Sequence, residues 1–171
     1  MNELELTLSK INHFQFIHKH LFTSGCPEPT DLQSIKEYGV NTLINIALIE
    51  EDRCIPHEDK RCLEIGLNYI HLPISFDMPS VDQCILVLDL IDHLVKEQMV
   101  WVHCQDNLHA SCLMYLYRQY YMDIDIATAQ ELLHEIWEPN ATWTGLIHAV
   151  TLQLQGRKAT QDLQSELAAA D

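Results

Sequence analysis

The fold of this sequence is decided by the stretch Met99-Val100-Trp101-Val102-His103-Cys104-Gln105-Asp106-Asn107-Leu108-His109-Ala110-Ser111. It has the pattern of an apolar strand that ends in His-Cys, followed by a short polar loop and the start of a helix. A cysteine between a buried strand and a helix N-terminus lies where free backbone N–H groups and the helix dipole favour negative charge. Such a position lowers the pKa of a thiol and forms a concavity for an anion. The stretch therefore predicts an anion-binding loop around Cys104.

Length and composition indicate one folded domain. The chain has 171 residues, of which 47% are hydrophobic, which is enough to form a full core. The patterns along the chain divide it into an N-terminal arm at 1–12, a folded domain at 13–156 and a polar C-terminal tail at 157–171. We find no internal repeat or low-complexity linker within it.

The charge balance excludes some classes of partner. The formal net charge is -15, from 25 acidic and 10 basic side chains, which opposes binding to nucleic acid or to an anionic membrane through a basic patch. We expect no signal peptide, because residues 1–5 are acidic and lack an apolar core, and we find no apolar run long enough to span a bilayer. The six cysteines fall at irregular spacings without a C-x-x-C pair. We therefore expect a cytoplasmic protein with reduced thiols.

Strands alternate with helices along the chain. The expected strands are two short edge strands within 13–22, then 43–48, 69–74 and 99–103. The expected helices are 31–38, 58–65, 81–97, 109–122, 126–137 and 142–155, the last of them ended by Gly156. This order predicts an α/β fold, a three-layer sandwich whose mostly parallel central sheet is flanked by helices. In such sheets the ligand site lies beyond the carboxyl ends of the strands, where His103 and Cys104 are expected.

Several motifs, taken in order, resemble those of the cysteine-dependent protein tyrosine and dual-specificity phosphatases. In particular, the chain resembles the small bacterial dual-specificity-like phosphatases that were first catalogued as a family of unknown function. The matching stretches are Phe22-Thr23-Ser24-Gly25-Cys26-Pro27, Gly39-Val40-Asn41-Thr42-Leu43-Ile44-Asn45-Ile46, Tyr69-Ile70-His71-Leu72-Pro73-Ile74, Trp101-Val102-His103-Cys104, Ala110-Ser111 and Tyr115-Leu116-Tyr117-Arg118. The resemblance covers roughly residues 13–150 and implies a phosphatase-type sandwich.

The resemblance also implies roles for residues of the loop. Cys104 matches the nucleophile that attacks phosphorus, and Ser111 matches the hydroxyl that helps the thiolate leave. Asn107 stands where glycine is common, and asparagine tolerates the left-handed backbone that such a loop can need. The phosphate-binding loop would comprise His103, Gln105, Asp106, Asn107, Leu108, His109, Ala110 and Ser111. We expect His103 to be structural, holding the loop by a hydrogen bond.

The residue that would protonate the leaving oxygen is less sharply defined. Asp77 lies in the loop between strand and helix where the resemblance places this general acid. The family aspartate can also be aligned with Ser75. Asp82 is a further candidate, although in the first turn of a helix a carboxylate also complements the helix dipole. We take Asp77 as the candidate acid.

The arginine that clamps the phosphoryl oxygens in this family has no counterpart. Its position falls on Ala110 by the spacing of the general superfamily and on His109 by that of the bacterial group. Arg118 lies nine residues along the helix from His109, about 13 Å away at 1.5 Å per residue. Imidazole offers at most two donors and is mostly neutral at pH 7, whereas guanidinium offers five fixed donors. Loss of such a contact costs on the order of 10²–10⁴ in rate, so we expect weak or absent hydrolysis.

Three hypotheses about function remain open from the sequence. The first is a phosphatase-like enzyme that forms a phospho-cysteine at Cys104. The second is a pseudophosphatase, a module that binds an anion or a protein without turnover. The third is a thiol redox sensor in which Cys104 pairs with Cys26. The expected ligand is phosphate or a phosphorylated molecule at the loop. We expect no cofactor and no metal, since the histidines lack recognised zinc spacing.

Overall fold

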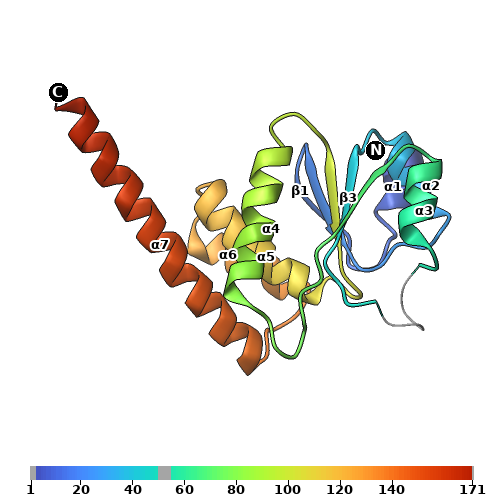
Figure 1. The fold of residues 1–171 in the computed structure, drawn as a ribbon. Helices are drawn as coiled ribbons and strands as arrows, with labels where there is room; N and C mark the ends of the chain where they lie inside the picture. Colours follow the sequence, from blue (N-terminus) through green and yellow to red (C-terminus); the bar gives the residue numbers. More distant parts are fainter. Residues whose placement is uncertain (1–2, 50–54, 171) are drawn as a thin grey trace.

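The computed structural model describes residues 3–49 and 55–170. A five-stranded sheet lies between two layers of helices (Figure 1). In spatial order its strands are β1 (Gln15–His18), β2 (Leu21–Ser24), β5 (Val100–His103), β3 (Thr42–Asn45) and β4 (Asn68–His71). β1 pairs antiparallel with β2, and the other three pairings are parallel. The prediction of a sandwich with a mostly parallel sheet is confirmed.

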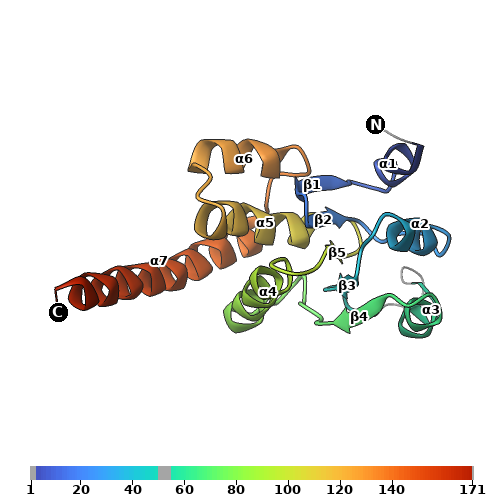
Figure 2. The same cartoon turned by 90° about the horizontal axis from the view of Figure 1, so that it is seen from above.

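Helices cover both faces of this sheet (Figure 2). One layer is formed by α1 (Glu3–Leu8), α2 (Asp31–Glu37) and α3 (Glu58–Glu64). The other side carries α4 (Val81–Leu94), α5 (Leu108–Tyr121), α6 (Ile126–His134) and α7 (Ala141–Ala169). None of the helices within the described ranges combines the length and apolar character needed to cross a membrane.

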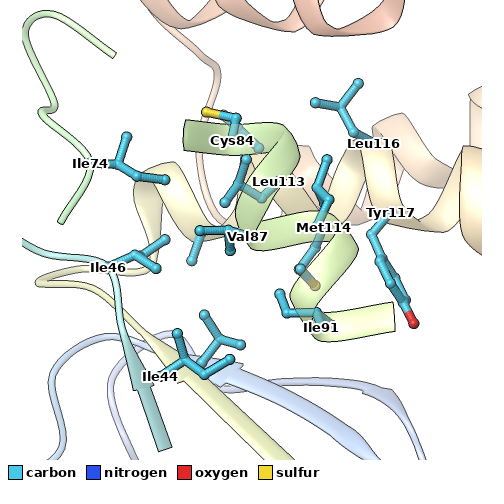
Figure 3. Packing of buried hydrophobic residues seen from close by; sticks show 14 of the residues in the cluster. Ile44, Ile46, Ile74, Cys84, Val87, Ile91, Leu113, Met114, Leu116 and Tyr117 are labelled. Carbon is cyan, nitrogen blue, oxygen red and sulfur yellow. The ribbon is translucent and has the colours of Figure 1, made fainter. Parts of the chain in front are cut away.

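Successive residues of each strand point to opposite faces of the sheet, so apolar side chains pack under both layers of helices. Phe22, Leu43 and Trp101 belong to the core under α1, α2 and α3, whereas Ile44 and Val102 belong to the core under α4 and α5. This period-2 pattern buries a sheet on both faces. Figure 3 shows the second core, where side chains of α4 and α5 meet those at the end of β3. The residues labelled there are Ile44, Ile46, Ile74, Cys84, Val87, Ile91, Leu113, Met114, Leu116 and Tyr117.

The sequence-based expectations at both ends of the chain were wrong in part. The first twelve residues contain the helix α1, whose Leu8 is buried in the core. At the other end α7 does not stop at Gly156 but continues to Ala169, so the segment expected as a polar tail is helical. β2 lies inside the sheet, so only β1 of the two expected edge strands is at an edge. A single glycine lowers helix stability without ending a helix.

The parallel register brings three strand ends to one point. Ser24 of β2 and Asn45 of β3 are the direct partners of His103 of β5. β5 is the central strand of the sheet, so the loop that follows it is flanked by the ends of two other strands. This places the stretch after His103 at the position where open α/β sheets bind ligands.

Packing of α4 onto the core gives a first prediction. Ile91 is fully buried between α4 and the sheet, whereas Leu86 of the same helix is 55% exposed. We expect Ile91→Ala to lower the free energy of unfolding by about 2–5 kcal/mol, because it leaves a cavity. Leu86→Ala is the matched control and should change it by less than about 1 kcal/mol. Urea denaturation measures both, and equal losses would contradict this assignment of the core.

Candidate functional site

The loop after β5 surrounds the sulfur of Cys104 with backbone donors. The backbone N–H groups of Ala110, Asp106, Asn107 and His109 hydrogen-bond this sulfur. Asn107 has φ 61° and is the N-cap residue of α5. The predicted left-handed backbone at Asn107 is therefore confirmed. A cluster of amides at a helix N-terminus has the geometry of an anion-binding nest.

Cys104 itself is not an ionised thiol. Its exposed fraction is 0%, and burial raises its pKa to about 11, although the four amides act in the opposite direction. The expectation that this position lowers the thiol pKa is therefore wrong. Desolvation disfavours the thiolate by more than the amides stabilise it. At neutral pH the Cys104 thiol is protonated.

The back of the loop is held by the segment before β1. The Asn107 amide Nδ2 donates to the carbonyl oxygen of His13 at 2.7 Å, and the His13 ring Nδ1 donates to the carbonyl oxygen of Asp106 at 2.7 Å. Asn12 Nδ2 lies 3.5 Å from Asp106 Oδ1. Gly25 packs closely here, since a Cβ at Gly25 would lie 2.9 Å from the Gln105 carbonyl oxygen. The loop conformation is thus fixed by contacts outside the nest.

His109 does not act as a clamp over Cys104. Its side chain is buried, and its Nε2 donates to the carbonyl oxygen of Ile46 at 3.2 Å. Burial lowers the pKa of His109 to about 4, a shift that the nearby His103 reinforces and the bond to Ile46 opposes. The imidazole is therefore neutral at physiological pH. Ala110, at the other position counted for the arginine, is fully buried and has no polar side-chain group.

An aromatic cluster packs against His109. The centroid of the His109 ring lies 5.5 Å from that of Trp143, in a stacked arrangement, and 6.0 Å from that of Phe76. The indole N–H of Trp143 donates to the Phe76 carbonyl oxygen at 2.9 Å, which fixes the loop between β4 and α4. The candidate acid Asp77 follows Phe76 directly and is exposed. The structure thus places Phe76, which the sequence did not single out, beside the position of the missing arginine.

His103 forms a buried ion pair that the sequence did not reveal. Its Nε2 lies 2.7 Å from Glu58 Oε1, and Glu58 Oε2 also accepts hydrogen bonds from Asn45 Nδ2 and Tyr69 Oη at 2.9 and 3.0 Å. Burial alone would lower the pKa of His103, but hydrogen bonds with Cys26 and Glu58 and the Glu58 charge raise it to about 9. Burial alone would raise the pKa of Glu58, yet these bonds hold it below its usual value.

The remaining predicted residues are engaged elsewhere or exposed. Ser111 Oγ donates to the Leu108 carbonyl oxygen at 2.6 Å and accepts from the Trp137 indole at 3.1 Å. Arg118 is buried, with Nη2 3.5 Å from Gln15 Oε1. The alternative acid Asp82 is exposed in the first turn of α4. Within the described ranges, no three His, Cys, Asp or Glu side chains are grouped closely enough to hold a metal ion.

Solved structures with this architecture identify the fold. A DUF442 protein of Shewanella putrefaciens CN-32, whose name proposes a phosphatase, has a TM-score of 0.77 at 24% identity over 87% of this chain and 97% of its own. Tk-PTP in its active form gives 0.68, at 18% identity over 80% and 95% of the two chains. The core catalytic domain of the PP-IP phosphatase SIW14 of S. cerevisiae gives 0.70, at 11% identity over 89% and 94%.

These neighbours are cysteine-dependent phosphatases or named as candidates for that activity. The chain therefore has the fold of the cysteine-dependent protein tyrosine and dual-specificity phosphatases, including that of the DUF442 protein. No protein-family model matches the chain, and a search of the curated proteins found no match. The phosphatase-type fold that the order of strands and helices predicts, and that the resemblance implies, is confirmed.

The buried His109 predicts a stability that falls in acid. Its pKa is about 4 in the folded protein against 6.5 in its ordinary state, so below pH 6.5 the unfolded chain binds a proton that the folded chain excludes. The free energy of unfolding should fall between pH 6.5 and pH 4, by up to about 3 kcal/mol from this residue.

Urea denaturation at several pH values measures this effect. The control is His109→Gln, which keeps an N–H donor for Ile46 but does not titrate. The free energy of unfolding of this variant should lack the decrease between pH 6.5 and pH 4 that His109 causes. The decrease caused by the carboxylates should remain in both proteins. Parallel profiles for the two proteins would contradict the assignment.

Proposed function

We propose that this chain is a pseudophosphatase, a phosphatase-fold protein that keeps the anion-binding loop but does not turn over phosphomonoesters. The observation that carries the proposal is the side chain at the arginine position. His109 is neutral, buried and hydrogen-bonded to Ile46. Without a fixed cation the loop lacks the charge that would stabilise a phosphoryl group in its transition state. Removal of a single such donor costs on the order of 10²–10³ in rate.

The protonation state of Cys104 supports the same proposal. A thiol with a pKa of about 11 is ionised in only about one molecule in 10⁴ at pH 7, and the thiolate is the reactive form. The candidate acid Asp77 is exposed, whereas Cys104 is fully buried. A cysteine that is neither ionised nor exposed is poorly suited to attack phosphorus.

What the loop retains is its set of backbone donors. Four amides at the N-terminus of the 14-residue helix α5 are directed at one point, and such nests bind anions without any charged side chain. The ligand would be phosphate or a phosphorylated group, presented by a small molecule or by a protein partner. The net charge of -15 opposes this binding at long range, so we expect it to be weak and dependent on salt.

The proposal predicts that hydrolysis does not depend on Cys104. Wild type and Cys104→Ser should hydrolyse an aryl phosphate at the same background rate from pH 5 to pH 8. A wild-type rate above that of Cys104→Ser at any pH in this range would overturn the proposal. The assay needs no partner, because aryl phosphates report the chemical step alone.

A second variant tests whether the missing arginine is the reason for the loss of hydrolysis. His109→Arg supplies the missing guanidinium, and we expect at least a tenfold gain over background that disappears when Cys104→Ser is added. Circular dichroism and a melting curve confirm that the variant is folded. A folded His109→Arg protein without any gain would show that the arginine is not the element that is lacking.

Thiol oxidation is a second candidate function, and a separate observation favours it. Cys26 is partly exposed and interacts with the His103 ring, whose Nε2 is bound by Glu58. A thiol, an imidazole and a carboxylate in series is the arrangement that activates a sulfur nucleophile. The backbone N–H of Cys26 donates to the Gln105 carbonyl oxygen at 2.8 Å, so this thiol lies beside the loop that contains Cys104.

Hydrogen peroxide is the oxidant for this second candidate. Peroxide transfers one oxygen atom to the Cys26 thiol, which becomes a sulfenic acid while one water is released. The ionised fraction of Cys104 then attacks that sulfur, the new disulfide forms, and the displaced hydroxide takes up a proton and leaves as a second water. Two electrons leave the sulfur atoms and reduce the peroxide.

Peptide mapping after peroxide treatment tests this chemistry. We expect a disulfide between Cys26 and Cys104 in the wild type, and a trapped sulfenic acid at Cys26 in Cys104→Ser. Cys112→Ser, which removes a fully buried thiol, is the control and should still form the disulfide. Treated wild type without a bond between positions 26 and 104 would remove this candidate.

A further inference from the structure

A cavity lies between the helices α1 and α2 and the strands beneath them. The two helices lie side by side on the same side of β1 and β2 (Figure 2), and the cavity has a volume of about 390 Å³. This volume is within the range of sites that bind small molecules. The residues that line it are Glu5, Leu8, Ser9, Phe14, Phe16, Phe22, Tyr38 and Trp101. None of them belongs to the loop at 104–111, so this cavity is distinct from the anion-binding loop.

Aromatic rings form a floor and two steep walls in this cavity. The buried rings of Phe22 and Trp101 are stacked, with centroids 5.7 Å apart and 22° between their planes. Phe16 and Tyr38 stand across Phe22, at 65° and 87° to its plane and with centroids 5.7 and 5.5 Å from it. The ring of Phe14 lies 5.5 Å from that of Trp101. Rings at steep angles around one centre have the geometry of an aromatic cage.

The cage is already formed, and its walls are open to solvent. Phe16 is 59% exposed, and Phe14 is partly exposed. On the floor, the indole N–H of Trp101 donates to Ser24 Oγ at 2.9 Å, which fixes the orientation of that ring. A site whose side chains are in place before the ligand arrives loses little conformational entropy on binding. A small ligand can therefore reach the rings without rearrangement of the fold.

Glu5 of α1 contributes a carboxylate to the lining of this cage. No other residue of the lining, all of which the structure describes, has an acidic or basic side chain. The face of an aromatic ring attracts a cation through its quadrupole, and the carboxylate adds a Coulomb attraction of the same sign. Both features repel an anion, as does the net charge of -15. The lining therefore favours a cation that has an apolar surface.

We propose that this cavity binds a small organic cation with a quaternary ammonium group, such as choline. The positive charge of this group is covered by methyl groups, so it has no N–H donors that the rings would leave unsatisfied. A primary ammonium has three donors, and aromatic rings offer no acceptor atoms to them. Aromatic faces are the recognised partners of quaternary ammonium ligands. The ligand is a free small molecule, because the cavity has the volume of a small-molecule site.

Titration of the full chain with choline chloride tests this proposal. The comparison ligand is dimethylbutanol, a neutral isostere of choline in which carbon replaces the nitrogen. Backbone amide NMR signals of Phe14, Phe16 and Phe22 report binding, at constant chloride concentration. We expect saturable shifts with choline and an affinity at least about fivefold higher than that for the isostere. Equal affinities, or no saturable shift with choline, would overturn the proposal.

Two variants test the roles of the ring and the carboxylate. Phe16→Leu keeps an apolar side chain but removes an aromatic face, so we expect choline to bind about threefold more weakly while the isostere binds as before. Glu5→Gln should also weaken choline binding by about threefold. Its control is Glu3→Gln, the same change of charge on α1 outside the lining, which should bind choline as wild type does.

Circular dichroism establishes that these variants are folded. A folded Phe16→Leu protein with wild-type affinity for choline would show that the rings do not hold the cation. Equal effects of Glu5→Gln and Glu3→Gln would show that only the overall charge matters. Either result would overturn the proposal, and neither depends on whether the loop around Cys104 binds an anion or hydrolyses phosphomonoesters.

Discussion

A buried carboxylate–imidazole pair joins the end of the central strand to a helix on one face of the sheet. Glu58 is the first residue of α3, and His103 is the last residue of β5. The same carboxylate accepts from Asn45 at the end of β3 and from Tyr69 of β4, so three neighbouring strands meet at one side chain. Removal of one partner from a buried pair typically costs about 3–5 kcal/mol, because the other charge is left uncompensated. The loop that starts at the next residue depends on this anchored strand end.

The conformation of the loop around Cys104 does not depend on a charged side chain. The amides around Cys104 are positioned by the left-handed turn at Asn107 and by hydrogen bonds between the loop and the segment at His13. None of these contacts involves a cationic clamp. A loop of this kind can therefore keep its anion-binding backbone without an arginine, because the residues that fix its conformation are not those that catalyse the reaction.

The fold could be predicted from the sequence because its signals are local. Alternation and helical spacing located the strands and most helices, and the His-Cys pair at a strand end located the loop. Asn107 was also predictable, since few residues accept its backbone angles. The partner of His103 was not, because Glu58 lies 45 residues away along the chain and no periodic pattern links two such positions. The pKa of Cys104 was misjudged because burial, which the sequence does not give, outweighs the amides.

The packing around position 109 explains why this position differs from that of a phosphatase with an arginine clamp. In this chain the side chain there is a core residue, stacked on Trp143 and next to Phe76. A guanidinium in the same place would have to be desolvated among aromatic rings, and burial of an unpaired charge is unfavourable. Neutral imidazole instead satisfies the Ile46 carbonyl and contributes apolar contact. The residues that surround His109 thus stabilise the fold at the position where the clamp would lie, which leaves the backbone amides around Cys104 as the anion-binding element.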